Sequence, residues 1–211
     1  MEQSLQNEAN EKYAVEYDSW FDKHTNFYHS ELAAIRNAIP DNKKGIEIGI
    51  GSGRFAAQLG ITYGVEPVKA MAAIAKNRGI TVYEAYAENL PIYDNVFDFV
   101  LMVTVDCFLK DIEAAFKEVY RILKADGVCI VGMIDKETEL GKKYENEKQS
   151  NKFYREAHFH STKELTEYLK QSGFQNFQYW QTLTKLNEEE IEKTEKGYGK
   201  GSFVVIKASK V

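Results

Sequence analysis

The sequence predicts an α/β protein built around a mostly parallel sheet, and three observations support that prediction. From about residue 44 onward, short apolar runs alternate with amphipathic stretches, which is the pattern of strands joined by helices. The run 97–105 is almost continuously apolar, as expected of a central strand that helices cover on both faces. The first apolar run leads directly into a turn with glycine at positions 49, 51 and 53.

The individual elements follow in order along the chain. Strands are expected at 45–50, 62–65, 81–83, 97–105, 128–134, 177–184 and 203–208, the last two forming a closing hairpin. Helices are expected at 68–77, 112–124 and 162–171, where apolar residues recur at helical spacing. The charged run 187–196 is expected to be a solvated loop or helix.

The segment 11–39 is expected to be helical and is unusually aromatic. Its aromatic residues include Tyr13, Tyr17, Trp20 and Phe21. Their helical spacing fits a face that docks on the sheet, and it equally fits a lid that closes over a ligand; both can hold at once. We therefore expect an N-terminal helical cap, residues 1–42, followed by a ligand-binding domain, residues 43–211.

Composition and charge limit the partners and the compartment. The 211 residues carry a formal net charge of −5, and lysine and arginine are scattered among acidic residues, so nucleic acid is not expected as a partner. Cys107 and Cys129 fall in or beside buried runs, which indicates a reducing compartment. Residues 1–11 lack the apolar core of a signal peptide, and no segment is long enough to cross a bilayer. We expect a cytoplasmic protein without membrane contact, and these patterns do not determine its oligomeric state.

The glycine-rich turn and a later acidic residue predict a nucleoside site. Gly49, Gly51 and Gly53 permit positive φ and let a ligand lie against bare backbone. Glu66 falls at the end of the second strand, where a carboxylate can accept hydrogen bonds from both hydroxyls of a ribose. Glu47, two residues before Gly49, would attract an ammonium group and repel a pyrophosphate.

Two other interpretations of this turn were weighed. The stretch 51–56 also satisfies the dinucleotide fingerprint GxGxxA, which favours a nicotinamide cofactor, and a lone match of that kind is weak. In the second interpretation the glycine-rich turn is purely structural, and Glu47 has no role in binding a ligand. Glu47 favours S-adenosylmethionine, which carries an ammonium group, over both.

Several ordered motifs resemble the class I S-adenosylmethionine-dependent methyltransferase family, and within it the small-molecule branch similar to the ubiquinone and menaquinone biosynthesis methyltransferases. They are the glycine-rich motif 47–53, the acid motif 65–67, the loop and strand motifs 87–91 and 95–99, and the helix and turn 115–127. The resemblance covers residues 43–135 well and is looser outside. It implies a Rossmann-like fold with seven strands in the order 3-2-1-4-5-7-6.

The resemblance also implies a set of cofactor contacts. Besides the glycines and the two acids named above, the set comprises Tyr17, Pro67, Ala87, Glu88 and Val103. Tyr17 matches a tyrosine that reaches toward the methionine carboxylate. Many relatives hold the adenine amino group with an aspartate where this chain has Tyr86, so adenine recognition is expected to rest on backbone. Glu88 is equally compatible with capping the adjacent turn.

The function predicted is methyl transfer by in-line displacement from S-adenosylmethionine to an unidentified small-molecule acceptor, with S-adenosylhomocysteine as the product. The sequence names no catalytic residue and predicts no metal site. Candidates for a proton-accepting or acceptor-binding role are Asp106, Cys107, His158 and His160. Their ordinary interpretations are an exposed loop or helix cap for Asp106, a small buried hydrophobe for Cys107, and packing or capping for the histidines, which would point the same way from a strand. Phe153 and Tyr154 fall where such enzymes recognise their acceptors. The alternatives are a protein of this fold that binds the cofactor without transferring methyl, and a nicotinamide-dependent oxidoreductase.

Overall fold

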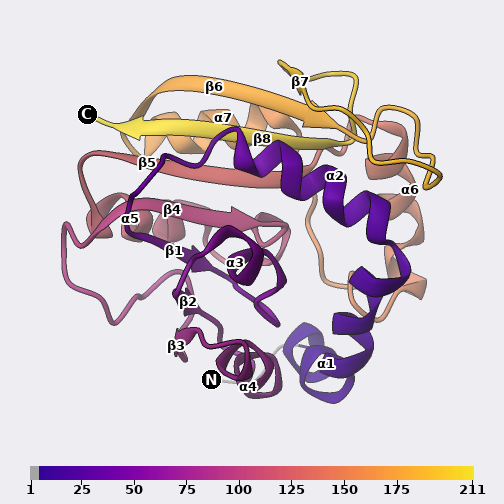
Figure 1. Cartoon of the computed structure of the whole chain (residues 1–211), viewed down its shortest axis with the longest axis horizontal. Coiled ribbons are helices and arrows are strands. Elements are labelled where there is room, and N and C mark those ends of the chain that lie inside the picture. Colours follow the sequence, from indigo (N-terminus) through magenta and orange to yellow (C-terminus); the bar gives the residue numbers. More distant parts are fainter. Residues whose placement is uncertain (1–4) are drawn as a thin grey trace.

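The computed structural model describes residues 5–211, which form a central sheet with helices on both faces (Figure 1). The strands are β1 (Gly45–Ile48), β2 (Tyr63–Val65), β3 (Thr81–Tyr83), β4 (Phe97–Val103), β5 (Leu123–Ile134), β6 (Phe174–Thr182), β7 (Glu195–Lys196) and β8 (Phe203–Lys210). Their order in the sheet is β3-β2-β1-β4-β5-β8-β6-β7. Strands β1 to β5 pair in parallel, whereas β8 runs antiparallel to both β5 and β6.

This sheet confirms the predicted α/β class and the order of the seven expected strands, because β8 and β6 are the strands expected as seventh and sixth. The difference is β7, a two-residue strand that pairs with β6 at the edge. It lies in the charged run 187–196, which was expected to be a solvated loop or helix. That expectation is wrong for part of the run, because Glu192 is buried and its carboxylate accepts the backbone N–H groups of Thr184 and Lys185.

The helices lie on both sides of the sheet (Figure 1). They are α1 (Leu5–Lys23), α2 (Thr25–Arg36), α3 (Arg54–Leu59), α4 (Lys69–Asn77), α5 (Ile112–Ile122), α6 (Glu139–Glu147) and α7 (Thr162–Gln171), with short 3₁₀ turns at Asp106–Phe108 and Lys148–Ser150. The three helices predicted downstream of the first strand are confirmed as α4, α5 and α7. Helix α7 starts at a capping box, in which the Ser161 hydroxyl accepts the N–H of Glu164 and the Glu164 carboxylate accepts the N–H of Ser161.

The central strand β4 is buried on both faces, as its nearly continuous apolar sequence predicts. Val100 and Met102 pack on one side in the cluster that contains Phe116 of α5, and Leu101 packs on the other side in the cluster that contains Ile35 of α2. Each such buried side chain contributes roughly 1.5–3 kcal/mol to stability. The strand ends at Val103, two residues earlier than predicted, where the next residue adopts a left-handed φ of 49° and turns the chain.

The N-terminal segment differs from the single helical stretch expected at 11–39. Two helices, α1 and α2, meet at a bend near His24. Helix α2 lies along the sheet and contacts β5, β6 and β8, whereas α1 lies beside α4 (Figure 1). The division into a cap of residues 1–42 and a domain of residues 43–211 stays a prediction, and residues 1–4 of that cap lie outside the described part.

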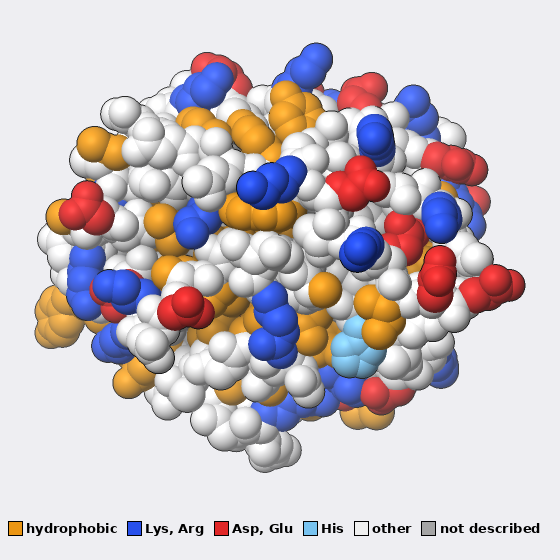
Figure 2. Space-filling model, turned by 45° about the horizontal axis from the view of Figure 1, so that its top comes forward, with side chains coloured by type: hydrophobic (Ala, Val, Ile, Leu, Met, Phe, Trp, Pro, Cys, Tyr) orange, Lys and Arg blue, Asp and Glu red, His pale blue; other side chains and the backbone are white. Residues whose placement is uncertain are grey.

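The surface carries charges of both signs. Figure 2 shows lysine, arginine and acidic side chains interspersed over one face of the molecule. Across residues 5–211, no helix has the length and apolar character required to cross a membrane. Cys107 and Cys129 are both buried, free thiols.

Candidate functional site

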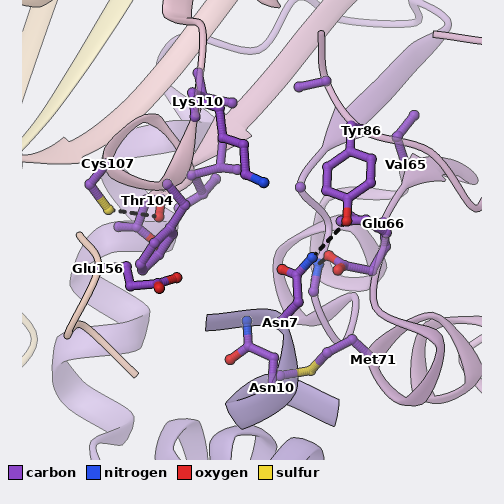
Figure 3. Close-up of a pocket in the computed structure, with 18 of the residues that line it drawn as sticks. Asn7, Asn10, Val65, Glu66, Met71, Tyr86, Thr104, Cys107, Lys110 and Glu156 are labelled. Carbon is purple, nitrogen blue, oxygen red and sulfur yellow. Dashed lines mark hydrogen bonds between the residues drawn. The ribbon is translucent and has the colours of Figure 1, made fainter. Parts of the chain in front are cut away.

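A cavity of ≈ 310 Å³ opens at the carboxyl ends of β1, β2 and β4, next to helix α1, whose Asn7 and Asn10 line it (Figure 3). The loops that follow parallel strands converge at this edge, which is where open α/β sheets bind ligands. Eight of the ten predicted cofactor residues line it: Tyr17, Gly49, Gly51, Glu66, Pro67, Ala87, Glu88 and Val103. Glu47 and Gly53 do not reach the cavity wall.

The three glycines of the turn have different physical roles. Each has positive φ, with values of 69° at Gly49, 55° at Gly51 and 83° at Gly53. A Cβ at Gly49 would lie 2.3 Å from Val105 Cγ2, and a Cβ at Gly53 would lie 2.7 Å from Ile80 Cδ1, so these two glycines permit close packing. A Cβ at Gly51 would meet only the Tyr17 ring, at 3.9 Å. Gly51 is therefore the position at which a ligand can approach bare backbone.

Glu66 is held in place by the glycine turn. One oxygen, Oε2, accepts the N–H of Gly51 at 2.8 Å, and the other, Oε1, accepts the N–H of Val68 at 2.9 Å. Burial raises the pKa of Glu66 to about 7, although these two backbone hydrogen bonds oppose the shift. The carboxylate thus lies fixed at the end of β2, next to the backbone of the turn.

Glu47 lies inside β1, buried beneath the turn with 2% of its surface exposed. Its Oε2 atom has no hydrogen-bond partner among the described residues. Burial raises the pKa of Glu47 well above its usual value, the Ala56 N–H lowers it, and the charge of Glu66 raises it further. A buried carboxylate oxygen without a partner is costly, and a cationic ligand group nearby would reduce that cost.

Helix α1 is tied to the glycine turn by a network of ion pairs that the sequence did not reveal. The Asp18 carboxylate accepts hydrogen bonds from Arg54 at 2.9 Å and from Arg78 at 2.8 Å, and Arg78 also donates to the carbonyl oxygen of Ser52. Burial raises the pKa of Asp18, but the two arginines outweigh it and hold that pKa well below its usual range. This network places Tyr17, the residue before Asp18, against the cavity.

The loop after β3 closes the cofactor side of the cavity. The Tyr86 hydroxyl accepts a hydrogen bond from Asn7 Nδ2 at 2.9 Å, which joins this loop to helix α1 (Figure 3). Glu88 lines the cavity, and its Oε1 also accepts the N–H of Lys110 at 2.9 Å. Glu88 thus holds the segment before α5 and not the adjacent turn that it was considered to cap.

The opposite side of the cavity contains side chains suited to an acceptor. Its aromatic wall comprises Phe108, Phe153 and Tyr154, and its polar groups include Cys107, Glu156 and His158. The Cys107 thiol donates to the carbonyl oxygen of Thr104 at 3.6 Å, and burial raises its pKa well above the usual value, so it is a neutral thiol. Phe153, Tyr154, Cys107 and His158 were sequence candidates for this region.

Asp106 and His160 do not line the cavity. Asp106 was expected to be an exposed loop or helix-capping residue, but it is 3% exposed, and its Oδ2 lies 3.3 Å from Nδ1 of the buried His160. His158 and His160 were expected to share one side of a strand; the segment is an extended loop in which the two rings lie 5.0 Å apart. Across residues 5–211, no group of three or more potential ligands is arranged to hold a metal ion.

Sequence reasoning missed several lining residues, among them Asn7, Asn10, Lys110 and Glu156. Lys110 follows the end of β4, and loops at carboxyl ends of parallel strands commonly line sites, so its position was an available signal. Glu156 lies between Tyr154 and His158, both already singled out. The polar N-terminal asparagines carry no local pattern, because only the packing of α1 brings them to the cavity.

Comparison with known proteins identifies the class. Residues 46–131 match the model of a methyltransferase domain family. One similar protein is a SAM-dependent methyltransferase from Thermotoga maritima, named a possible histamine N-methyltransferase, whose crystal structure is known. It is 47% identical to this chain, and the two structures have a TM-score of 0.94. The match covers 97% of this chain and 99% of that chain. An uncharacterized protein of Methanocaldococcus jannaschii is 46% identical over 206 residues, with 95% and 98% covered.

A more distant structure agrees in fold. Phosphoethanolamine N-methyltransferase 2 of Haemonchus contortus, solved with S-adenosyl-L-methionine, has a TM-score of 0.62 at 18% identity, covering 87% of this chain and 52% of that one. The Thermotoga maritima relative, 47% identical over 97% of this chain, shows that the chain belongs to the S-adenosylmethionine-dependent methyltransferase family. The predicted class, fold and cofactor are confirmed, in preference to a nicotinamide-dependent oxidoreductase.

Proposed function

We propose that this protein catalyses methyl transfer from S-adenosylmethionine to a small-molecule acceptor. The observation that carries the proposal is the combination in one cavity of the Gly51 and Glu66 pair with a separate aromatic and polar wall. A cofactor bound along the first side would direct its methyl group toward the second. A protein that only bound the cofactor would have no use for the second wall.

Different residues bind different parts of the cofactor. Glu66 accepts the ribose hydroxyls, and Gly51 lets the ligand approach the backbone. Glu47 does not line the cavity, but its unpartnered oxygen is buried below the turn, where the charge of a bound ammonium group would favour its ionised form. Tyr17 faces the methionine carboxylate; burial and then the charge of Glu66 raise its pKa, so its hydroxyl stays protonated and can donate. The remaining cofactor contacts are Pro67, Ala87, Glu88 and Val103, which line the adenine and ribose walls.

Methyl transfer requires the protein to align the reactants and requires no covalent intermediate on the protein. The sulfonium makes the methyl carbon electrophilic, so the acceptor atom attacks in line and the carbon–sulfur bond breaks with its electron pair going to sulfur. Aromatic rings of α1 and of the segment at Phe153 and Tyr154 exclude water and present faces that stabilise positive charge.

Two measurements test this function. Calorimetry with S-adenosylmethionine and S-adenosylhomocysteine is expected to show saturable binding, and reduced nicotinamide cofactor is expected to show none. Incubation with methyl-labelled S-adenosylmethionine and a panel of amines, thiols, alcohols and carboxylic acids, histamine included, is expected to label one class. Cofactor binding without labelling of any acceptor class would favour the non-transferring alternative, and no cofactor binding by the folded protein would overturn the proposal.

The pKa of Glu66 predicts how cofactor binding depends on pH. Ribose hydroxyls donate to the ionised carboxylate, so binding favours the deprotonated form of a group whose pKa is about 7. Affinity for S-adenosylhomocysteine should therefore fall about tenfold between pH 8 and pH 6, as the carboxylate takes up its proton. Calorimetry between pH 6 and pH 8 measures this change in affinity. Glu66→Gln removes the titrating group and should flatten the profile; an equally steep profile in that variant would assign the dependence to another group.

A further inference from the structure

The side of the cavity opposite Glu66 has a composition that indicates the chemistry of the acceptor. Figure 3 places Cys107, Thr104 and Glu156 on one side of the cavity, and Glu66, Tyr86 and Asn7 on the other. The first side is where the methyl group of a bound cofactor would meet its acceptor. Its groups are therefore the ones that select the acceptor.

Aromatic rings form the walls on this side. The Tyr17 and Phe153 rings meet edge to face with centroids 5.6 Å apart, and the Phe108 and Tyr154 rings are stacked with centroids 6.0 Å apart. Tyr154 is stacked in turn on Tyr144, at 5.2 Å. Ring faces that line a cavity attract ammonium groups through the negative potential of the π system.

Two carboxyl groups lie at or behind these walls, and at neutral pH that of Glu31 is mostly protonated. Glu156 lines the cavity itself. Glu31, on α2, is 7% exposed, and burial raises its pKa to about 8. Burial and then the charge of Glu31 raise the pKa of Tyr144 to about 12, and Tyr144 stacks on Tyr154 of the aromatic wall. A cation in front of the rings would hold Glu31 in its ionised form.

Cationic side chains are few by comparison. Lys110 is the single lysine or arginine among the described residues that line the cavity. Like Glu156 and His158 it is exposed, and it lies in the loop that also contacts Glu88. His158 also lines the cavity, and its backbone N–H donates to the carbonyl oxygen of Cys107 on the acceptor side. Its imidazole is a nitrogen base. The acceptor side thus combines ring faces, the Glu156 carboxylate and one imidazole.

We propose that the methyl acceptor is a small amine, captured as its ammonium ion between the aromatic wall and Glu156; the proposal rests on the proposed transferase function. The bound ammonium gives one proton to the His158 imidazole, and the freed nitrogen lone pair attacks the methyl carbon. The carbon–sulfur bond breaks with its electron pair going to sulfur. The products are the N-methylated ammonium ion and S-adenosylhomocysteine, and His158 returns its proton to solvent.

The test compares matched amines and alcohols on the full chain saturated with S-adenosylhomocysteine. The probe pairs are 2-phenylethylamine with 2-phenylethanol and butylamine with 1-butanol, and 3-phenylpropanoate serves as an anionic probe. Calorimetry is expected to show that at least one amine binds about tenfold or more tightly than its alcohol, because only the amine carries the charge. Binding of S-adenosylhomocysteine is measured first, so that failure of the cofactor site is distinguished from failure of this proposal.

Two variants locate the effect. Glu156→Gln keeps the shape of the side chain and removes its charge, so the preference for the amine should shrink to about threefold or less. Glu139→Gln makes the same change in charge at an exposed position of α6 outside the cavity, and it should leave the preference intact. Equal binding of amine and alcohol, tighter binding of the carboxylate, an unchanged preference in Glu156→Gln, or no binding of either amine beside bound S-adenosylhomocysteine would each overturn the proposal.

Discussion

Replacing Glu66 by glutamine should weaken S-adenosylhomocysteine binding by about 100-fold at pH 8, which corresponds to about 3 kcal/mol. At that pH most of the Glu66 carboxylate is ionised, because its pKa is about 7. Two charge-assisted hydrogen bonds to the ribose hydroxyls would be lost or weakened, and the amide NH₂ would face the N–H of Gly51 or Val68, which both donate to this side chain. Calorimetry of both proteins measures the difference.

Glu84→Gln is the matched control for this change. Glu84 lies just after β3, is exposed, and pairs with Lys76 on the surface, so its substitution should change the affinity by less than about twofold. Thermal unfolding without ligand shows whether Glu66→Gln has damaged the fold. Affinity of a folded Glu66→Gln protein within twofold of the original would contradict the ribose-binding role.

Substituting Gly51 by alanine should lower cofactor affinity by about tenfold or more, at a modest cost to folding. The new methyl group would extend toward Tyr17 into the space that the ligand is proposed to occupy, because no other atom lies within 4 Å of it. The backbone at φ 55° remains accessible to alanine at a cost of about 1–2 kcal/mol. Calorimetry and denaturant unfolding measure the two effects separately.

Gly60→Ala isolates the backbone cost, since Gly60 has φ 71° and a Cβ there would meet nothing within 4 Å. It should lose a similar free energy of unfolding and bind the cofactor normally. Gly49→Ala should lose more free energy of unfolding than Gly51→Ala, because its Cβ would overlap Val105. If Gly51→Ala binds S-adenosylhomocysteine as tightly as Gly60→Ala does, the ligand does not approach the backbone at this turn.

Local patterns in the sequence were sufficient for much of the fold and for the cofactor side of the site. Gly51 and Glu66 each follow a strand of a parallel sheet, and parallel strands bring their carboxyl ends to one edge. Position along the chain therefore implies position in space. Glu88 is a partial exception, because its contact with Lys110 joins two loops whose approach depends on how each strand ends.

The sequence by itself determined the class of fold, the strand order through its family resemblance, the cofactor, and most of the residues that line the cofactor side, because periodicity and motif spacing encode local geometry directly. Only the tertiary structure decided that Asp106 pairs with a buried His160 instead of facing the cavity. It also decided that Glu156 and the N-terminal asparagines reach the cavity. These contacts join segments far apart in the chain, and their positions depend on the packing of α1 and of the loop before α7, which no local pattern specifies.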